Sequence, residues 1–109
     1  MNAWEPITEA EIRELIQAAR ERMTEPQRRF WEAVRIEPVK WQQDPYGTEG
    51  RGFWAVGIYG RRVIWFNDIE IGFNLSSWTT SGVLGDYGCN QDQLEWSVGY
   101  AMDEGRIPE

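Results

Sequence analysis

The side chains that could do chemistry in this chain are mainly carboxylates of its second half. Asp68 and Glu70 share one face of an extended run, and Asp86, Asn90 and Asp92 follow later. Paired carboxylates can serve as general acid and base or hold a hard cation. However, the spacing matches no calcium loop, and the chain has no histidine. We therefore expect no catalytic residue, no metal site and no cofactor.

Nucleophilic side chains give no stronger signal. Cys89 precedes an expected helix, and a helix N-terminus lowers the pKa of a thiol. Without histidine, both a Cys–His pair and a serine hydrolase triad built on Ser76 or Ser77 are excluded. We interpret Cys89 as a packing residue against Leu94 and expect that the chain is not an enzyme.

Aromatic side chains offer a second kind of site. Stacked rings bind sugars and single-stranded nucleic acid. The residues that could form such a platform are Trp41, Trp54, Trp65, Trp78 and Trp96, with Tyr46, Tyr59 and Tyr87. Core packing produces the same alternation along strands, and we favour it.

The charge is unevenly distributed. The net charge is −7, and residues 1–62 hold ten Lys or Arg against ten Asp or Glu, whereas residues 63–109 hold one against eight. Phosphate backbones require clustered cations, so nucleic acid is not expected as a partner. An acidic half suits either a basic protein partner or simple solubility.

Length and cysteine content limit the class of protein. The 109 residues fit a single domain, residues 1–109. The single cysteine forms no internal disulfide, and we find neither an N-terminal apolar signal segment nor a run near the ~20 apolar residues of a membrane span. We expect a cytoplasmic protein without membrane association.

Two helices are predicted at the N-terminus. Thr8 with Glu11 forms a capping box, and Thr24 with Gln27 repeats the signal for a second helix over Glu25–Arg35. The first helix carries an apolar stripe at helical spacing, formed by Ile12, Leu15, Ile16, Ala19 and Met23.

A meandering antiparallel sheet of about four strands should follow. Residues 36–43 are predicted to form an edge strand because of Pro38, and a turn is expected at residues 44–47. Phe53–Tyr59 is apolar at both parities, which indicates a central strand covered on both faces, and a two-residue Gly60-Arg61 turn leads into Arg62–Phe66.

The order of elements is less clear beyond this hairpin. Asn67-Asp68 indicates a bulge, bend or turn, and Ile69–Leu75 either continues the strand or starts a new one. Ser76–Leu84 could supply another short strand. A last helix over Gln91–Asp103, capped by Asn90, completes a predicted α+β fold.

Several motifs stand out in the middle of the chain: Ile36-Glu37-Pro38, Lys40-Trp41, GFWAVGIYG (52–60), VIWFNDIEIGFN (63–74) and CNQDQL (89–94). Together they resemble a family of short uncharacterised bacterial proteins. The resemblance covers residues 36–94 and implies no activity, cofactor or site residue.

These features favour a non-enzymatic protein-binding module. Our hypothesis is a cytoplasmic immunity or antitoxin-type inhibitor that turns an acidic face toward a basic toxin. The residues expected to contact this partner are Asn67, Asp68, Glu70, Asn74, Trp78, Asp86, Tyr87, Asp92 and Glu95. The alternative is a small-ligand or carbohydrate-binding domain that uses exposed tryptophans.

Overall fold

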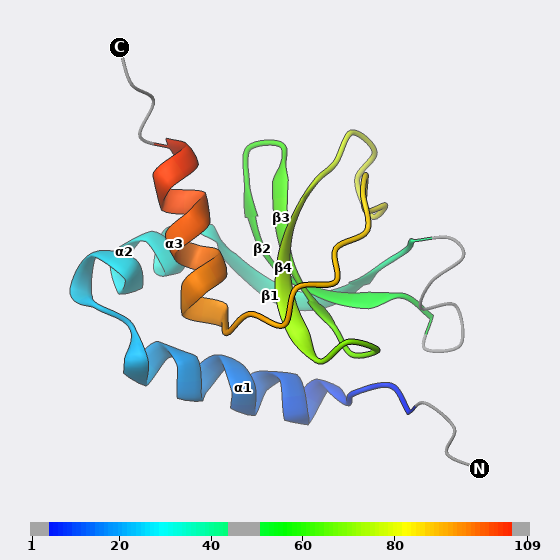
Figure 1. The fold of residues 1–109 in the computed structure, drawn as a ribbon, viewed down its shortest axis with the longest axis horizontal. Coiled ribbons are helices and arrows are strands. Elements are labelled where there is room, and N and C mark those ends of the chain that lie inside the picture. Colours follow the sequence, from blue (N-terminus) through cyan, green and yellow to red (C-terminus); the bar gives the residue numbers. More distant parts are fainter. Residues whose placement is uncertain (1–4, 44–50, 106–109) are drawn as a thin grey trace.

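The structure, a computed structural model, describes residues 5–43 and 51–105, so the predicted turn at residues 44–47 lies outside the described residues. Its elements are α1 Glu9–Arg22, α2 Glu25–Val34, β1 Arg35–Trp41, β2 Phe53–Tyr59, β3 Arg62–Asn67, β4 Gly72–Ser77 and α3 Leu94–Gly105. The predicted α+β fold, with two N-terminal helices, a four-stranded antiparallel meander and a C-terminal helix, is confirmed within these ranges. In Figure 1, α2 and α3 lie on one side of the sheet, and the segment joining β4 to α3 lies on the other.

The first two helices begin where their capping boxes predict. The Thr8 hydroxyl accepts from the Glu11 amide at 3.1 Å, and the Thr8 amide donates to the Glu11 carboxylate at 2.9 Å. Thr24 and Gln27 make the equivalent pair of bonds at 3.3 and 2.9 Å. Each box satisfies amides that the first helical turn leaves without partners, which fixes where α1 and α2 start.

The strands follow each other in the sheet order β1-β2-β3-β4. The predicted hairpin is present: Tyr59 pairs with Arg62 across Gly60 and Arg61, and Gly60 has a φ of 58°, which glycine adopts without steric cost. Pro38 lies in β1 at the edge of the sheet, as predicted, where its missing amide costs no hydrogen bond within the ladder.

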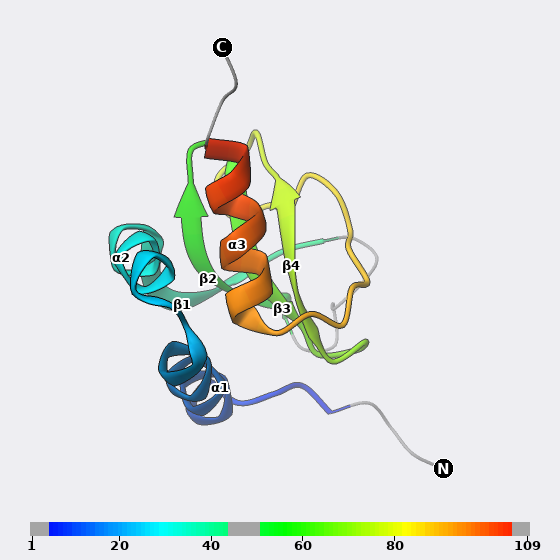
Figure 2. The same ribbon diagram turned by 60° about the vertical axis from the view of Figure 1, so that its left-hand side comes forward.

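A hydrophobic core lies on each face of the sheet. Helices cover the first face, where Val56, Ile64 and Phe66 pack with Trp31 and Leu94. Figure 2 shows α3 lying in front of this face. The second core consists of Trp41, Phe53, Ala55, Val63, Trp65 and Leu84. The prediction that β2 is covered on both faces is therefore confirmed.

The segment after β4 covers the second core without forming the predicted strand within Ser76–Leu84. β4 ends at Ser77, and Val83 makes only an isolated parallel bridge with Gln42, next to the end of β1. In this bridge the Gln42 amide donates to Gly82 at 2.8 Å, and the Leu84 amide donates to Gln42 at 2.9 Å. The segment thus reaches from β4 across the face to the opposite edge of the sheet.

The last helix starts at Leu94, later than the predicted Gln91. The Gln93 carbonyl accepts the first helical bonds, from the amides of Trp96 and Ser97. Residue 92 is instead extended beside β4, because the Phe73 amide donates to the Asp92 carbonyl at 2.9 Å. The predicted cap at Asn90 and the staple between Cys89 and Leu94 are therefore wrong, and Cys89 is exposed.

No helix within the described residues is both long enough and apolar enough to cross a membrane.

Candidate functional site

Asn67, predicted to contact a partner, is fully buried and serves the fold. Its Oδ1 accepts from the amides of Ile69 and Glu70 at 3.0 and 3.1 Å, which closes the turn between β3 and β4. Its Nδ2 donates to the Tyr87 hydroxyl and the Gly88 carbonyl, each at 2.8 Å. One side chain therefore joins the turn to the segment before α3, and it offers no surface to a partner.

Asn74 is buried in the same way and holds the next part of that segment. Its Oδ1 accepts from the Asn90 amide at 2.9 Å, and its Nδ2 donates to the Asn90 carbonyl at 3.1 Å. The side chain imitates the backbone of a neighbouring strand. Gly72 permits the close approach, since a Cβ there would lie 2.3 Å from Cα of Gln91.

Asp68 is buried and ties the residues before α1 to the sheet. Its Oδ2 accepts from the Ile7 amide at 2.8 Å, and Trp54 Nε1 donates to the Ile7 carbonyl at 2.9 Å. Burial raises the pKa of Asp68 above its ordinary value, although the Ile7 amide and the charge of Lys40 oppose the shift. This carboxylate is therefore part of the interior.

Glu95 is the fourth buried residue of the predicted contact set, and it fastens α3 to α1. Its carboxylate accepts from Nε and Nη2 of Arg22 at 2.7 and 3.1 Å. Burial alone would raise the pKa of Glu95, but the hydrogen bonds from Arg22 and from the backbone lower it below the ordinary value. A two-point guanidinium–carboxylate pair holds its partners in a defined geometry.

We predict that Glu95→Gln lowers the free energy of unfolding at pH 7 by about 1–2 kcal/mol, because it removes a charge-assisted pair. A depressed folded-state pKa gives stability that is present above the unfolded pKa and is lost as the pH falls through the folded pKa. The deficit of the variant should therefore shrink in acid. Urea unfolding between pH 7 and pH 3 measures it.

Asp68→Asn is the control, because its effect on stability should change with pH in the opposite direction. The raised pKa of Asp68 means that its contribution is present below the unfolded pKa and is lost as the pH rises through the folded pKa. The stability of this variant relative to the natural chain should therefore improve with rising pH. Parallel pH profiles of the two variants would contradict one of the two assignments, and the sign of the common slope would identify which one.

Three of the remaining predicted contact residues, Asp86, Tyr87 and Trp78, make contacts within the fold. Asp86 is exposed, but its carboxylate accepts from the amide and hydroxyl of Ser77 at 2.8 and 2.6 Å. Tyr87 packs against Phe53 and Trp65 of the second core. Trp78 is half-buried, edge-on to Trp41, with the Arg61 guanidinium 4.7 Å from its ring centre.

Two predicted acids, Glu70 and Asp92, lie close to each other along the chain that borders β4. The Glu70 carbonyl accepts from the Gln91 side chain at 3.0 Å, and Asp92 follows directly. Both are partly buried. Asp92 is the nearer to α3, whose exposed side carries a candidate site that the sequence predictions include only through Glu95 and Trp96.

That site is an aromatic groove beside α3. Trp96 and Tyr100 lie one helical turn apart, and each is 50% exposed. Together with Gln27, Glu95, Gly99 and Asp103 they line a groove of about 480 Å³. Two large aromatic side chains left half in water beside a groove are typical of a binding surface.

The charged lining of the groove is acidic. Asp103 contributes a carboxylate, whereas the Glu95 carboxylate is already paired with Arg22, and among the described residues no Lys or Arg lines the groove. Gly99 keeps the floor open, since a Cβ there would meet only the Gln27 side chain, at 3.7 Å. This combination of two aromatic faces and the Asp103 carboxylate suits a cationic group such as a lysine or arginine side chain.

The exposure of the tryptophans limits which of them could bind a carbohydrate. Trp31, Trp41 and Trp65 are buried in the two cores, and Trp54 and Trp78 are only partly exposed. Trp96 is therefore the described tryptophan with the most accessible ring. No group of three or more Cys, Asp or Glu residues within the described ranges lies where it could hold a metal ion.

Comparisons of the chain with protein-family models, curated proteins and solved structures found no match. The resemblance of residues 36–94 to short bacterial proteins stays a prediction. Function must therefore be argued from the geometry of the chain.

Proposed function

We propose that this chain is a non-enzymatic, cytoplasmic protein-binding module, an immunity or antitoxin-type inhibitor that takes a basic segment of its partner into the groove beside α3. The observation that carries the proposal is the pair Trp96 and Tyr100, half-exposed above a lining whose charges are carboxylates. Of the residues expected from the sequence to contact the partner, Glu95 is the one that lines this groove.

The aromatic rings and the net charge would contribute to binding in different ways. Aromatic faces supply apolar area and attract cations with about 0.5–2 kcal/mol per contact, depending on how far water is excluded. The net charge of −7 attracts a basic partner over a longer range and raises the association rate. Specific anchoring then falls to Trp96 and Tyr100.

The test is co-purification with the product of an adjacent gene, followed by titration of the complex at low and high salt. Asp103→Lys should weaken binding about tenfold at low salt, because it reverses a charge on the groove. Glu14→Lys makes the same charge change on the exposed side of α1 and is the control. A complex that forms equally well with both variants would remove the groove from the proposal.

A neutral carbohydrate is the second candidate, because the ring of Trp96 is accessible beside a groove large enough for a sugar. Fluorescence titration with a glycan panel separates the two candidates. A saturable change in emission that Trp96→Phe reduces, with no response to an arginine-rich peptide, would favour the carbohydrate.

A further inference from the structure

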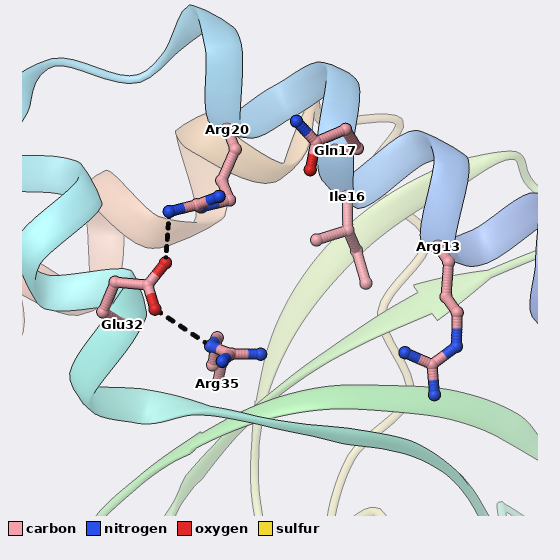
Figure 3. Close-up of a pocket in the computed structure, with 6 residues that line it drawn as sticks. All are labelled: Arg13, Ile16, Gln17, Arg20, Glu32 and Arg35. Atoms are coloured by element: carbon pink, nitrogen blue, oxygen red, sulfur yellow. Dashed lines mark hydrogen bonds and ion pairs between the residues drawn. The ribbon is translucent and has the colours of Figure 1, made fainter.

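A second cleft lies on a different part of the molecule, between α1, α2 and the start of β1. Figure 3 shows its lining, which consists of Arg13, Ile16, Gln17, Arg20, Glu32 and Arg35, around a volume of about 330 Å³. Ile16 projects between the guanidinium groups and gives the cleft an apolar floor. α2 contributes to both clefts, through Gln27 beside α3 and through Glu32 here, but no residue lines both.

Arginine side chains predominate in this lining. Three guanidinium groups surround the cleft, and Glu32 is its single carboxylate. Oε2 of Glu32 lies 2.7 Å from Nη2 of Arg20, and Oε1 accepts from Nε of Arg35 at 3.1 Å. A guanidinium has five N–H donors in a planar fork, so this sharing leaves donors on both arginines for another acceptor.

Arg13 completes the set from the preceding turns of α1. It pairs with Glu9 and with Glu37, each at 2.7 Å. These carboxylates lie outside the lining and hold the guanidinium at the mouth of the cleft. Arg13 is therefore paired with carboxylates outside the lining, and Arg20 and Arg35 are the two guanidinium groups that share the single carboxylate of Glu32.

An orphaned donor lies in the same place. The Nε of Arg20 is buried and has no hydrogen-bond acceptor among the described residues. Burying an N–H without an acceptor is unfavourable, and such groups in proteins usually have a partner. Here the guanidinium is held beside Glu32, with a donor left over.

We propose that this cleft binds the oxyanion group of a small molecule, a phosphate or a carboxylate, which accepts from Arg20 and Arg35 while the apolar part of the ligand rests on Ile16. Guanidinium forks match the geometry of both oxyanions and bind them more strongly than neutral donors do. The site is independent of the proposed partner groove, so each can fail without the other.

The test is titration of the full chain with inorganic phosphate, and separately with citrate, at constant ionic strength made up with chloride. The side-chain Nε–H signal of Arg20 in a nitrogen-15 spectrum reports binding directly. We expect a saturable shift, and the stronger of the two ligands identifies the oxyanion class. A shift that grows linearly with both ligands means only general ionic screening and would overturn the proposal.

Matched variants sharpen the test. Arg20→Gln and Arg35→Gln should each weaken binding about tenfold, whereas Arg29→Gln, an exposed arginine of α2 outside the lining, should change it less than about twofold. Arg35 is half-exposed and its replacement leaves the cores intact. Glu32→Gln removes the competing carboxylate and should strengthen binding severalfold, so unchanged or weaker binding in that variant counts against the site.

Discussion

Replacing Asn67 with alanine should lower the free energy of unfolding by about 3 kcal/mol, because four hydrogen bonds of about 0.5–1.5 kcal/mol each are lost. The lost hydrogen bonds belong to two parts of the fold, the turn after β3 and the segment before α3. The turn after β3 loses the acceptor for its amides, and the segment before α3 loses the donor that holds Tyr87 and Gly88. Urea unfolding followed by tryptophan fluorescence measures the effect.

Two further variants test how much of this destabilisation comes from the Asn67 hydrogen bonds. Tyr87→Phe removes one of the four bonds and should cost about 1 kcal/mol. Asn90→Ala changes an exposed asparagine of the same segment and should cost less than about 0.5 kcal/mol. If Asn67→Ala and Asn90→Ala had similar stabilities, the role of Asn67 as a joint between turn and segment would be refuted.

Replacing Trp96 with alanine should weaken partner binding by about 2 kcal/mol, or roughly thirtyfold, because truncating a central aromatic anchor removes both its contact area and its attraction for cations. The indole is already half in water, so folding should suffer less than binding. The dissociation constant and the urea midpoint are measured on the same variant, which separates the two effects.

The control is Val39→Ala, an exposed apolar residue of β1. It should leave the affinity within about twofold, since isolated exposed apolar residues contribute little. Gly99→Leu tests the groove without removing an aromatic side chain, because the added side chain fills the floor beside Gln27. Full affinity in both Trp96→Ala and Gly99→Leu would place the contact surface elsewhere.

The parts of the fold that depend on neighbouring residues could be read from the sequence. Capping boxes at Thr8 and Thr24 are local hydrogen-bond patterns, and the Gly60-Arg61 turn is a local conformational requirement. The apolar residues at both parities of β2 likewise reported its two covered faces. Each signal is complete within about ten residues.

The parts of the fold that depend on contacts between distant residues could not be predicted from the sequence. Asn90 and Gln93 have the pattern of a helix start, but the buried Asn74 side chain binds the backbone of Asn90 and keeps it out of the helix. Asn67 fitted neither the core nor the surface pattern, because its four partners include residues some twenty positions away. Polar groups in the interior are explained by their partners, which sequence spacing does not reveal.

The sequence predictions named Trp96 and Glu95 but did not bring them together in one groove, for a related reason. Trp96 and Tyr100 have the spacing of one helix face, and they lie off the stripe of Leu94, Val98 and Ala101 that is buried. The sequence therefore shows that the two rings share a helix face. It does not show where α2 lies, and α2 supplies Gln27 to the lining of the groove.

The covered borders of the sheet restrict how a partner can attach. Beyond β4, the Phe73 amide already donates to Asp92, and Ser77 accepts from Gly85. At the other border, Pro38 offers no amide and Gln42 is bridged to the segment around Val83. These contacts occupy part of each border, so strand addition is disfavoured at these positions. The proposed partner would there be recognised through side chains, and selectivity would depend on which residues the helix surfaces present.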